Sequence, residues 1–343
     1  MKKTWALAAA AALFAAPAAA QNDVETFCDR YTGNPAVVRD RCGTVAQAVD
    51  AAQPQLGILM AGGNPTLGTA STGGVRLGLI PRVSLTGRIN VVAARLPDFR
   101  EETGGQVEQF AFPAPAVGAN LSVGLTQGVS VAPMIGGFGA IDLLGSVSVL
   151  PLSLLGDEFG DNAFSWGAGA RVGLIRESFV TPGVSVSLMY RSLGDVSIGE
   201  VCGGSEVPSG ANRTLCSTDG DFGEIEFGLD NWSARAAVSK RLLGLGLTAG
   251  VGYDRFETSS NLGFRAPSGP GGTDEVYRFE DIAVDNDRWS AFIDGSFTIL
   301  FGSIVAELGW MQGSDPIRAL PAISEFDPGE GTFFGSVGAR LSL

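Results

Sequence analysis

The chain has 343 residues, a formal net charge of −13 and no histidine. Its 49 glycines follow no period of three and 45% of its residues are hydrophobic, which excludes a collagen-like or disordered chain. The acidic balance argues against nucleic acid as a partner, because phosphates attract lysine and arginine. Without histidine, Ser-His-Asp catalysis and most zinc sites are excluded. We therefore expect no catalytic residue, no metal site and no cofactor; an enzyme that works with carboxylates alone is the alternative left open.

The first twenty residues have the features of a secretory signal peptide. Lys2 and Lys3 precede an apolar run over 5–16, Pro17 interrupts it, and an A-x-A cleavage site ends at Ala20. The run is too short to serve as a membrane anchor. We expect residues 1–20 to be removed, which takes away both lysines and changes the formal charge from −13 to −15.

Residues 21–53 predict a short helical segment ahead of the main domain. Apolar side chains recur at helical spacing behind Thr44, a plausible N-cap, and Pro54 is expected to end the helix. We expect this segment either to plug the lumen of a barrel or to cover its periplasmic mouth.

The four cysteines of this exported chain predict two disulfides. Of the three possible pairings, proximity in sequence favours Cys28–Cys42 and Cys202–Cys216. The second pair would close an external loop, and the first a periplasmic or lumenal segment.

From about residue 72 onward the dominant pattern has a period of two, with one apolar face and one face of small or polar residues. Many segments reach the nine residues or so that a tilted membrane strand needs, and aromatic residues gather near strand ends. Both features favour a transmembrane barrel over a soluble sandwich. The eleven strands predicted from this pattern are 72–80, 82–95, 115–125, 129–150 (bent), 163–175, 179–192, 223–240 (with a bulge near Asp230 and Asn231), 245–256, 286–299, 303–311 and 332–343.

The connections between these strands alternate between short and long, as in barrels with short periplasmic turns and longer outer loops. The long ones, which are acidic, are 96–114, 151–162, 193–222, 257–285 and 312–331. Because such barrels usually have an even number of strands, we expect a twelfth at 54–62; the alternative is that 54–71 crosses the lumen unpaired. The predicted fold is thus all-β: a transmembrane, antiparallel, up-and-down barrel of about 12 strands over residues 54–343.

The last strand carries a family resemblance. Val337, Ala339, Leu341 and Leu343 alternate with Gly338, Arg340 and Ser342. This pattern resembles the terminal strand that the barrel-assembly machinery recognises in bacterial outer-membrane β-barrel proteins, except that Leu343 stands where Phe is usual. The resemblance implies the outer membrane as location, and that machinery, outer-membrane lipid and lipopolysaccharide as partners.

A second resemblance lies before the barrel. Asn34-Pro35-Ala36 is similar to a triplet of the long-chain fatty acid transporter family, but it lies earlier in the chain than in that family. No functional residue is carried across.

Ten charged residues fall on the small-residue phase of their strands and are expected to face the lumen, because a charge that faces lipid is costly. They are Arg76, Arg82, Arg88, Arg171, Arg191, Arg235, Arg288, Asp254, Asp294 and Glu307. Either these charges pair with one another, or they form a selectivity surface for an anionic solute.

Two functions are compatible with these expectations. The leading one is a passive channel for small or hydrophobic solutes, partly plugged. The alternative is a structural or surface-interaction barrel with a filled lumen, which acts through its outer loops. About twelve strands lie between the sizes of filled barrels and of aqueous channels, so size does not decide between them.

Overall fold

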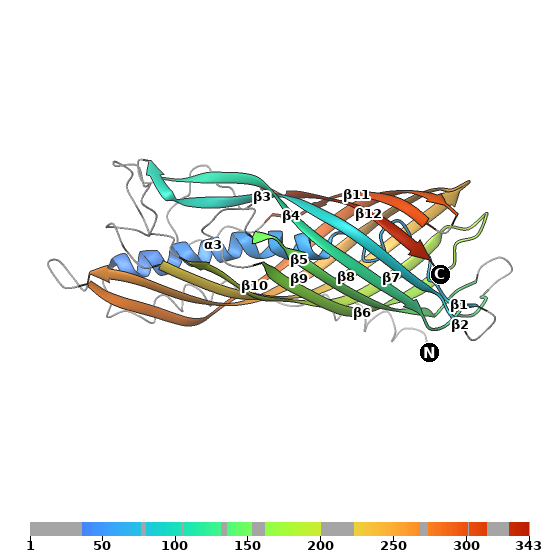
Figure 1. Ribbon diagram of the computed structural model, residues 1–343, viewed down its shortest axis with the longest axis horizontal. Helices are drawn as coiled ribbons and strands as arrows, with labels where there is room; N and C mark the ends of the chain where they lie inside the picture. The colour runs from blue at the N-terminus through green and yellow to red at the C-terminus, as the bar shows by residue number, and fades with distance from the viewer. Residues whose placement is uncertain are drawn as a thin grey trace, which may run out of the picture.

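The computed structural model describes residues 36–76, 80–103, 106–131, 136–152, 162–199, 223–267, 274–300, 302–313 and 329–342. Ten antiparallel strands form a closed barrel, and the last strand pairs with the first, from Ser342 opposite Ser84 to Phe334 opposite Val92 (Figure 1). The strands are β3 (Val83–Thr103), β4 (Gln106–Gly124), β5 (Ala140–Leu150), β6 (Ala163–Ile175), β7 (Gly183–Gly199), β8 (Gly223–Leu242), β9 (Leu245–Pro267), β10 (Asp274–Ile299), β11 (Gly302–Met311) and β12 (Thr332–Ser342).

The helix of the described residues, α3 (Ala36–Ala61), lies lengthwise inside this barrel (Figure 1). The chain then runs on through the lumen as an irregular, glycine-rich segment, residues 62–74, which we call the linker. The linker leads into β1 (Val75–Arg76), which pairs with β2 (Ile80–Pro81) in a small separate sheet. Among the described residues, no helix is long and apolar enough to cross a membrane.

The two ends of the barrel differ. At one, the turn end, most connections are short: Leu243 and Gly244 both have positive φ and join β8 to β9 as a tight turn, whereas the connection from β4 to β5 is longer, residues 125–139. β12 also ends here. At the other end, the ribbon end, two groups of strands extend further than the strands beside them: the pair β3 and β4, and the four strands β7, β8, β9 and β10. The contacts of α3 and the linker descend from the ribbon end, where Asn286 binds Asp50, to the turn end.

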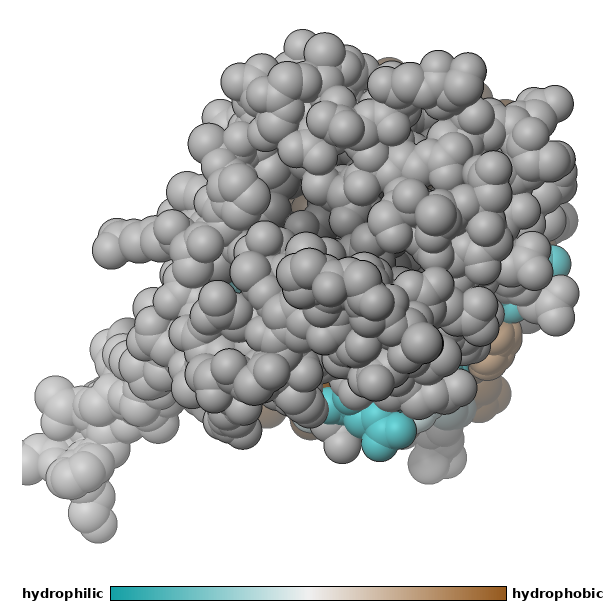
Figure 2. All heavy atoms as spheres, turned by 90° about the vertical axis from the view of Figure 1, so that its left-hand side faces the viewer, coloured by the Kyte–Doolittle hydropathy of each residue, from teal (hydrophilic) through white to brown (hydrophobic). Residues whose placement is uncertain are grey.

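The outside of the barrel wall is apolar between these ends. Leucine, isoleucine and valine side chains such as Val251 (52% exposed) alternate with inward polar residues. Seen from the ribbon end, hydrophobic surface shows on the flank of the wall (Figure 2). An aromatic belt bounds this apolar zone on seven consecutive strands: Phe164, Trp166, Tyr190, Trp232, Tyr253, Trp289, Trp310 and Phe333.

The belt lies one membrane thickness from the turn end. Trp232 is ten residues before the end of β8 at Leu242, and Trp289 is ten residues before the end of β10 at Ile299. At about 3.3 Å per residue and the usual strand tilt, this corresponds to an apolar band of about 25 Å. Neighbouring belt rings touch, with centroids 5.0 Å apart for Tyr190 and Trp232.

Beyond the belt, the two faces of the wall exchange character. In β10 the inward Ile282 and Val284 are 1% and 3% exposed, while Asp285 and Asp287 lie on the outward face. These inward apolar side chains belong to the part of the wall that encloses α3. Ile58, Leu59 and Met60 of α3 pack there with residues of nine strands: Val92, Ala94, Ala114, Ala116, Leu150, Leu193, Val196, Phe227, Leu229, Phe256, Phe292, Met311 and Phe334.

The helix also fills a seam in the ribbon end of the wall. β12 pairs with β3 only up to Val92, so the edge of β3 beyond this residue has no partner strand among the described residues. Gln55 of α3 takes that place, since its amide accepts from the Arg95 backbone N–H at 2.6 Å and donates to the Arg95 carbonyl at 2.6 Å. On the opposite side of the seam, Gln53 donates to Thr258 Oγ1 and to the Val284 carbonyl, both at 2.7 Å.

Two predictions about strand number are wrong. The barrel has ten strands rather than about twelve. Residues 54–62 are not a strand, because α3 continues to Ala61, and 72–80 contributes only the linker and the short β1 and β2. Residues 54–71 instead cross the lumen without pairing, which was the alternative expectation. The first part of this crossing is helical, up to Ala61.

Pro54 does not end the helix as predicted. Proline in a helix removes one backbone hydrogen bond. Here the surrounding turn is held from outside, since Gln53 is 1% exposed and bonded to two strands and Gln55 donates to the Ala51 carbonyl at 2.8 Å. Tertiary contacts thus outweigh the local penalty.

Three further boundaries differ from prediction. The strand predicted at 129–150 begins only at Ala140. Among the described residues before it, 125–131 and 136–139, the pairing is limited to the isolated bridge between Val129 and Phe138. Pairing of β8 with β9 is continuous through Asp230 and Asn231, so the predicted bulge is absent there; the irregularity lies on the neighbouring β7, between Leu193 and Val196. The outer connections predicted at 96–114, 193–222 and 257–285 begin or end within strands that continue past the belt.

Candidate functional site: the polar lower lumen

Between α3 and the turn end, the inward face of the barrel changes from apolar to polar where it meets the linker. In β8 the inward residues are Phe227 and Leu229 at the level of the helix, then Asn231, Ser233 and Arg235 at the level of the linker. The same face of β8 stays inward throughout, but its residues change from apolar to polar. In the sequence this change resembles a shift of phase near Asp230 and Asn231. The side chains at the lower level bind mainly the backbone of the linker.

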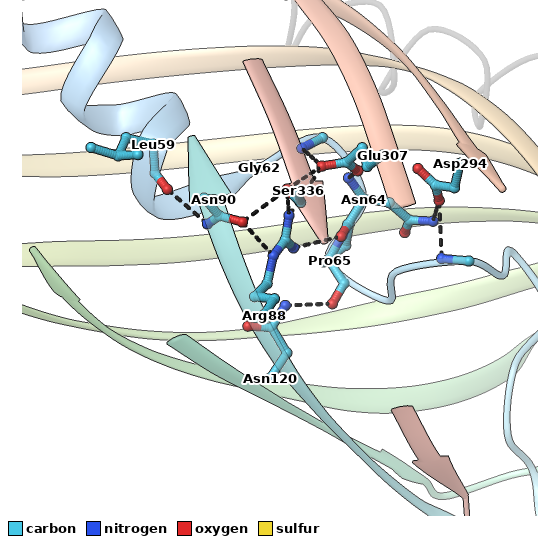
Figure 3. Close-up of polar contacts among 12 residues, drawn as sticks. Leu59, Gly62, Asn64, Pro65, Arg88, Asn90, Asn120, Asp294, Glu307 and Ser336 are labelled. Carbon is cyan, nitrogen blue, oxygen red and sulfur yellow. Dashed lines mark hydrogen bonds and ion pairs between the residues drawn. The ribbon is translucent and has the colours of Figure 1, made fainter. Parts of the chain in front are cut away.

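Glu307 of β11 is the centre of this network (Figure 3). Its carboxylate accepts from the backbone N–H of Gly63 at 3.0 Å and of Asn64 at 2.6 Å. It also accepts from Arg88 Nη2 at 3.0 Å and from Ser336 Oγ at 2.9 Å. The ion pair with Arg88 is almost fully buried. One carboxylate thus joins three strands to the linker.

Arg88 and Asn90 of β3 complete this cluster from the other side (Figure 3). Arg88 Nη1 donates to the Asn64 carbonyl at 3.1 Å, and its Nε donates to Asn90 Oδ1 at 2.6 Å. Asn90 in turn donates to the carbonyl of Leu59 at 2.7 Å, in the last turn of α3. The end of the helix and the start of the linker are therefore fixed together.

A second buried carboxylate, Asp294 of β10, holds the next turn of the linker. Asp294 Oδ2 accepts from the Asn64 side chain at 2.6 Å and from the Gly68 backbone N–H at 3.0 Å. Elsewhere on the wall, Asn120 of β4 donates to the Pro65 carbonyl at 3.0 Å, and Arg340 of β12 donates to the Leu67 carbonyl at 2.8 Å.

Asp142 and Arg171 bind the end of the linker near the turn end. Asp142 accepts from the backbone N–H of Gly73 at 3.0 Å and forms a buried ion pair with Arg171 at 2.5 Å. Arg171 also donates to Thr66 Oγ1 and, at 3.4 Å, to the Thr69 carbonyl. The linker is thus bonded along its whole length.

Arg235 of β8 forms the third buried ion pair, with Asp254 at 2.8 Å. It reaches the linker as well, because its Nε donates to the Gly63 carbonyl at 2.8 Å. Arg191 and Arg288 are also buried, and both bind neighbouring wall residues; Arg191 donates to Ser233 Oγ at 2.7 Å and Arg288 to Asn286 Oδ1 at 2.6 Å.

Glycine is required where the wall comes this close to the linker. Gly62 has φ +61°, a conformation that other residues adopt at a cost. A Cβ on Gly62 would lie 1.9 Å from Arg88 Nη2, and one on Gly63 would lie 2.6 Å from the Phe292 side chain. The glycine-rich sequence of the linker therefore matches the close fit of the barrel around it.

Of the ten charged residues predicted to face the lumen, the structure places eight at buried positions on the inner face: Arg88, Arg171, Arg191, Arg235, Arg288, Asp254, Asp294 and Glu307. Six of these eight form the network or its ion pairs, as described above. Arg82 is instead exposed at the turn end, and the side chain of Arg76 lies outside the described residues.

Two charged residues of the network were missed by the sequence reasoning, Asp142 and Arg340, which are 0% and 5% exposed. The alternation along each strand does place both residues inward. Asp142 lies on the same face of β5 as Ser148, and Arg340 is next to the outward Leu341. The bent strand predicted from residue 129 concealed the phase of Asp142. The linker residues Asn64 and Thr66 had no strand pattern from which to predict a role.

The predicted disulfides and signal peptide lie outside the described residues, apart from Cys42, of which only the backbone in α3 is described. Within the described ranges, no group of three or more histidine, cysteine, aspartate or glutamate side chains could hold a metal ion.

An apolar outer band closed by an aromatic belt, on a wall without free edges at that level, is the surface that a barrel presents to lipid. The protein is an outer-membrane β-barrel. Short turns mark the periplasmic end of such barrels, so we expect the turn end to be periplasmic and the ribbon end, with the first described residue of α3, to be outer.

No known protein family matches the sequence, and no curated protein is detectably similar. Solved structures with the same barrel architecture are outer-membrane proteins. The protease OmpT from Escherichia coli is 10% identical, with a TM-score of 0.35, over 77% of this chain and 96% of its own. The translocator domain of NalP from Neisseria meningitidis is 11% identical, with a TM-score of 0.33, over 87% of this chain and 97% of its own. The transport unit of AIDA-I from Escherichia coli is 8% identical, with a TM-score of 0.36, over 86% and 99%. Likeness at this level carries no argument about activity.

Proposed function

We propose that this protein is a closed outer-membrane barrel that acts at the cell surface through its outer ribbons and loops, rather than a passive channel. The observation that carries this proposal is the filled lumen: α3 occupies the outer half and the bonded linker the periplasmic half. Ten strands also enclose less space than the twelve that the sequence suggested.

The plug contributes to the wall itself, which supports a permanent role. Gln55 bonds to both polar backbone groups of Arg95 at the free edge of β3, as a partner strand would. Withdrawing α3 and the linker to open a path would leave that edge unpaired and would take the linker N–H groups away from Glu307, Asp294 and Asp142. Each lost charge-assisted hydrogen bond contributes about 1.5–3 kcal/mol, so an open state would be a rare one.

We also propose that the barrel has no enzymatic activity. A carboxylate pair would be the available catalyst in a chain without histidine. The buried carboxylates of the lower lumen are already committed, since Glu307 and Asp294 each accept linker N–H groups and Asp254 is paired with Arg235. Lipid, lipopolysaccharide and the barrel-assembly machinery stay as the proposed partners of the wall and of the last strand.

Single-channel recording in planar bilayers tests the proposal. The folded wild-type barrel should show no steady conductance, whereas deletion of residues 36–74 should produce one if the shortened chain still migrates differently on gels with and without boiling. Steady conductance of the wild type would refute the closed barrel and favour the channel. Failure of the deleted chain to fold would support a structural role for the plug.

Accessibility in intact cells tests the surface role. A protease site introduced beyond the belt at Asp287, on the outward face of β10, should be cleaved by added protease. An equivalent site at Leu243, in a turn at the periplasmic end, is the control and should be cleaved only after the outer membrane is opened. The reverse pattern would invert the orientation and remove the basis of the proposal.

A further inference from the structure

A cavity of about 590 Å³ opens at the periplasmic end, between the end of the linker and the turns. We call it the vestibule. Its charged lining residues are Arg82, Arg176, Arg241 and Glu177, three cations and one anion. The vestibule is therefore basic, in a chain whose formal net charge is −13.

Two of these arginines are uncommitted. Arg176 donates to the Gln127 carbonyl, and Glu177 accepts from the backbone N–H of Arg241 and from Ser239 Oγ. Within the described part of the chain, the guanidinium groups of Arg82 and Arg241 have no hydrogen-bond or ion-pair partner. Both line the same cavity, so two free planar cations face one space.

We propose that the vestibule binds a phosphate group between the guanidinium groups of Arg82 and Arg241. Guanidinium forks match the oxygens of phosphate and bind it with charge-assisted hydrogen bonds. The cavity volume is that of a typical small-molecule site. Because the linker above is bonded to Asp142 and Arg171, the ligand binds from the periplasm and does not pass through.

The phosphate can come from a lipid headgroup or from a water-soluble phosphate ester. Phe179 and Leu243 line the same cavity and are 88% and 102% exposed, at the end of the apolar band where the inner leaflet ends. These apolar side chains would lie beside acyl chains if the ligand is a phospholipid. The inference goes beyond the proposed surface function and does not depend on what the outer ribbons contact.

Titration calorimetry of the folded barrel in non-ionic detergent tests the proposal, with glycerol phosphate and short-chain phosphatidylglycerol as probes. Wild-type protein should bind at least one probe. The affinity of the double variant R82Q/R241Q for that probe should be lower by a factor of about ten or more, because charge-assisted hydrogen bonds are lost. Arg255→Gln at the outer end, which removes a half-exposed guanidinium paired with Glu257, is the matched control and should bind like the wild type.

Should the arginine variant fail to fold, protection of Arg82 and Arg241 from phenylglyoxal by the probe in wild-type protein replaces it. Binding of both probes indicates phosphate alone, and binding of the lipid only indicates the inner leaflet as the source. No binding of either probe, equal binding by R82Q/R241Q, or absence of protection would overturn the proposal.

Discussion

Replacing Glu307 by glutamine should loosen the linker without unfolding the barrel. The carboxylate accepts two linker bonds, from Gly63 and Asn64, and two wall bonds, from Arg88 and Ser336. Glutamine has nearly the same shape but no charge and only one acceptor oxygen. Charge-assisted hydrogen bonds contribute about 1.5–3 kcal/mol each and neutral ones about 1 kcal/mol.

Only the linker bonds are lost when the linker detaches, because Arg88 and Glu307 both belong to the wall. E307Q should therefore lower the free energy of local opening by about 2–3 kcal/mol, which raises the opening equilibrium about 30- to 150-fold. The global stability should fall further, by about 3–5 kcal/mol, since Arg88 is left as a buried charge without its carboxylate.

Hydrogen exchange separates these two effects. The backbone amides of Gly63 and Asn64 should exchange faster in E307Q by the factor given above, read by mass spectrometry of peptides that cover the linker. Glu330→Gln is the matched control: it removes a carboxylate paired with Arg95 but 58% exposed, a class of pair worth about 0–1 kcal/mol. Exchange at Gly63 and Asn64 that is unchanged in E307Q would refute the role given to this carboxylate.

Three further predictions follow from other contacts. Gly62→Ala should destabilise the barrel by about 2 kcal/mol or more in urea unfolding, because Gly62 has a positive φ and its added Cβ would meet Arg88. Gly87→Ala is the control and should be neutral, because a Cβ at Gly87 meets nothing within 4 Å. Equal stability of the two variants would contradict the close fit around the linker. In a double-mutant cycle with leucine at Tyr190 and Trp232, the rings should show a coupling of about 0.5–1.5 kcal/mol, and zero coupling would argue against their contact in the belt. Mass spectrometry of a non-reduced digest should show Cys28–Cys42 and Cys202–Cys216, and a Cys28–Cys202 or Cys42–Cys216 linkage would contradict the predicted pairing.

The membrane-embedded part of this barrel could be predicted from sequence because its pattern is uniform there. One face of each strand meets lipid and the other meets a polar lumen, so apolar and small or polar residues alternate without interruption. β6 was predicted with its observed bounds, and eight inward charges were placed by the same phase. Most strand ends at the periplasmic turns were predicted to within a few residues for the same reason, whereas the start of β5 was placed at 129 instead of Ala140.

The outer halves of the strands were missed because the alternation reverses there. Above the belt water replaces lipid outside, and α3 replaces polar groups inside, so the apolar phase moves from outward residues such as Ile293 to inward residues such as Ile282. A pattern that reverses within one strand resembles the end of that strand. The acidic residues Asp285 and Asp287 then appear to belong to a loop, although they lie on the outward face of β10.

The helix and the linker were the least predictable elements, because their partners are far away in sequence. Gln53 and Gln55 bind strands about 230 and 40 residues later, and nothing near Pro54 in the chain reveals this. The linker is more informative in retrospect: Gly62, Gly63 and Gly68 lie where wall side chains reach the backbone. A run of glycines before a barrel whose inward face carries unusually many charges indicates that those charges bind a backbone rather than a solute. This distinction separates a lumen filled by its own chain from one built for transport, because a transport path needs polar groups that are free to exchange partners, whereas Glu307, Asp294 and Asp142 are bound to fixed amides of the linker.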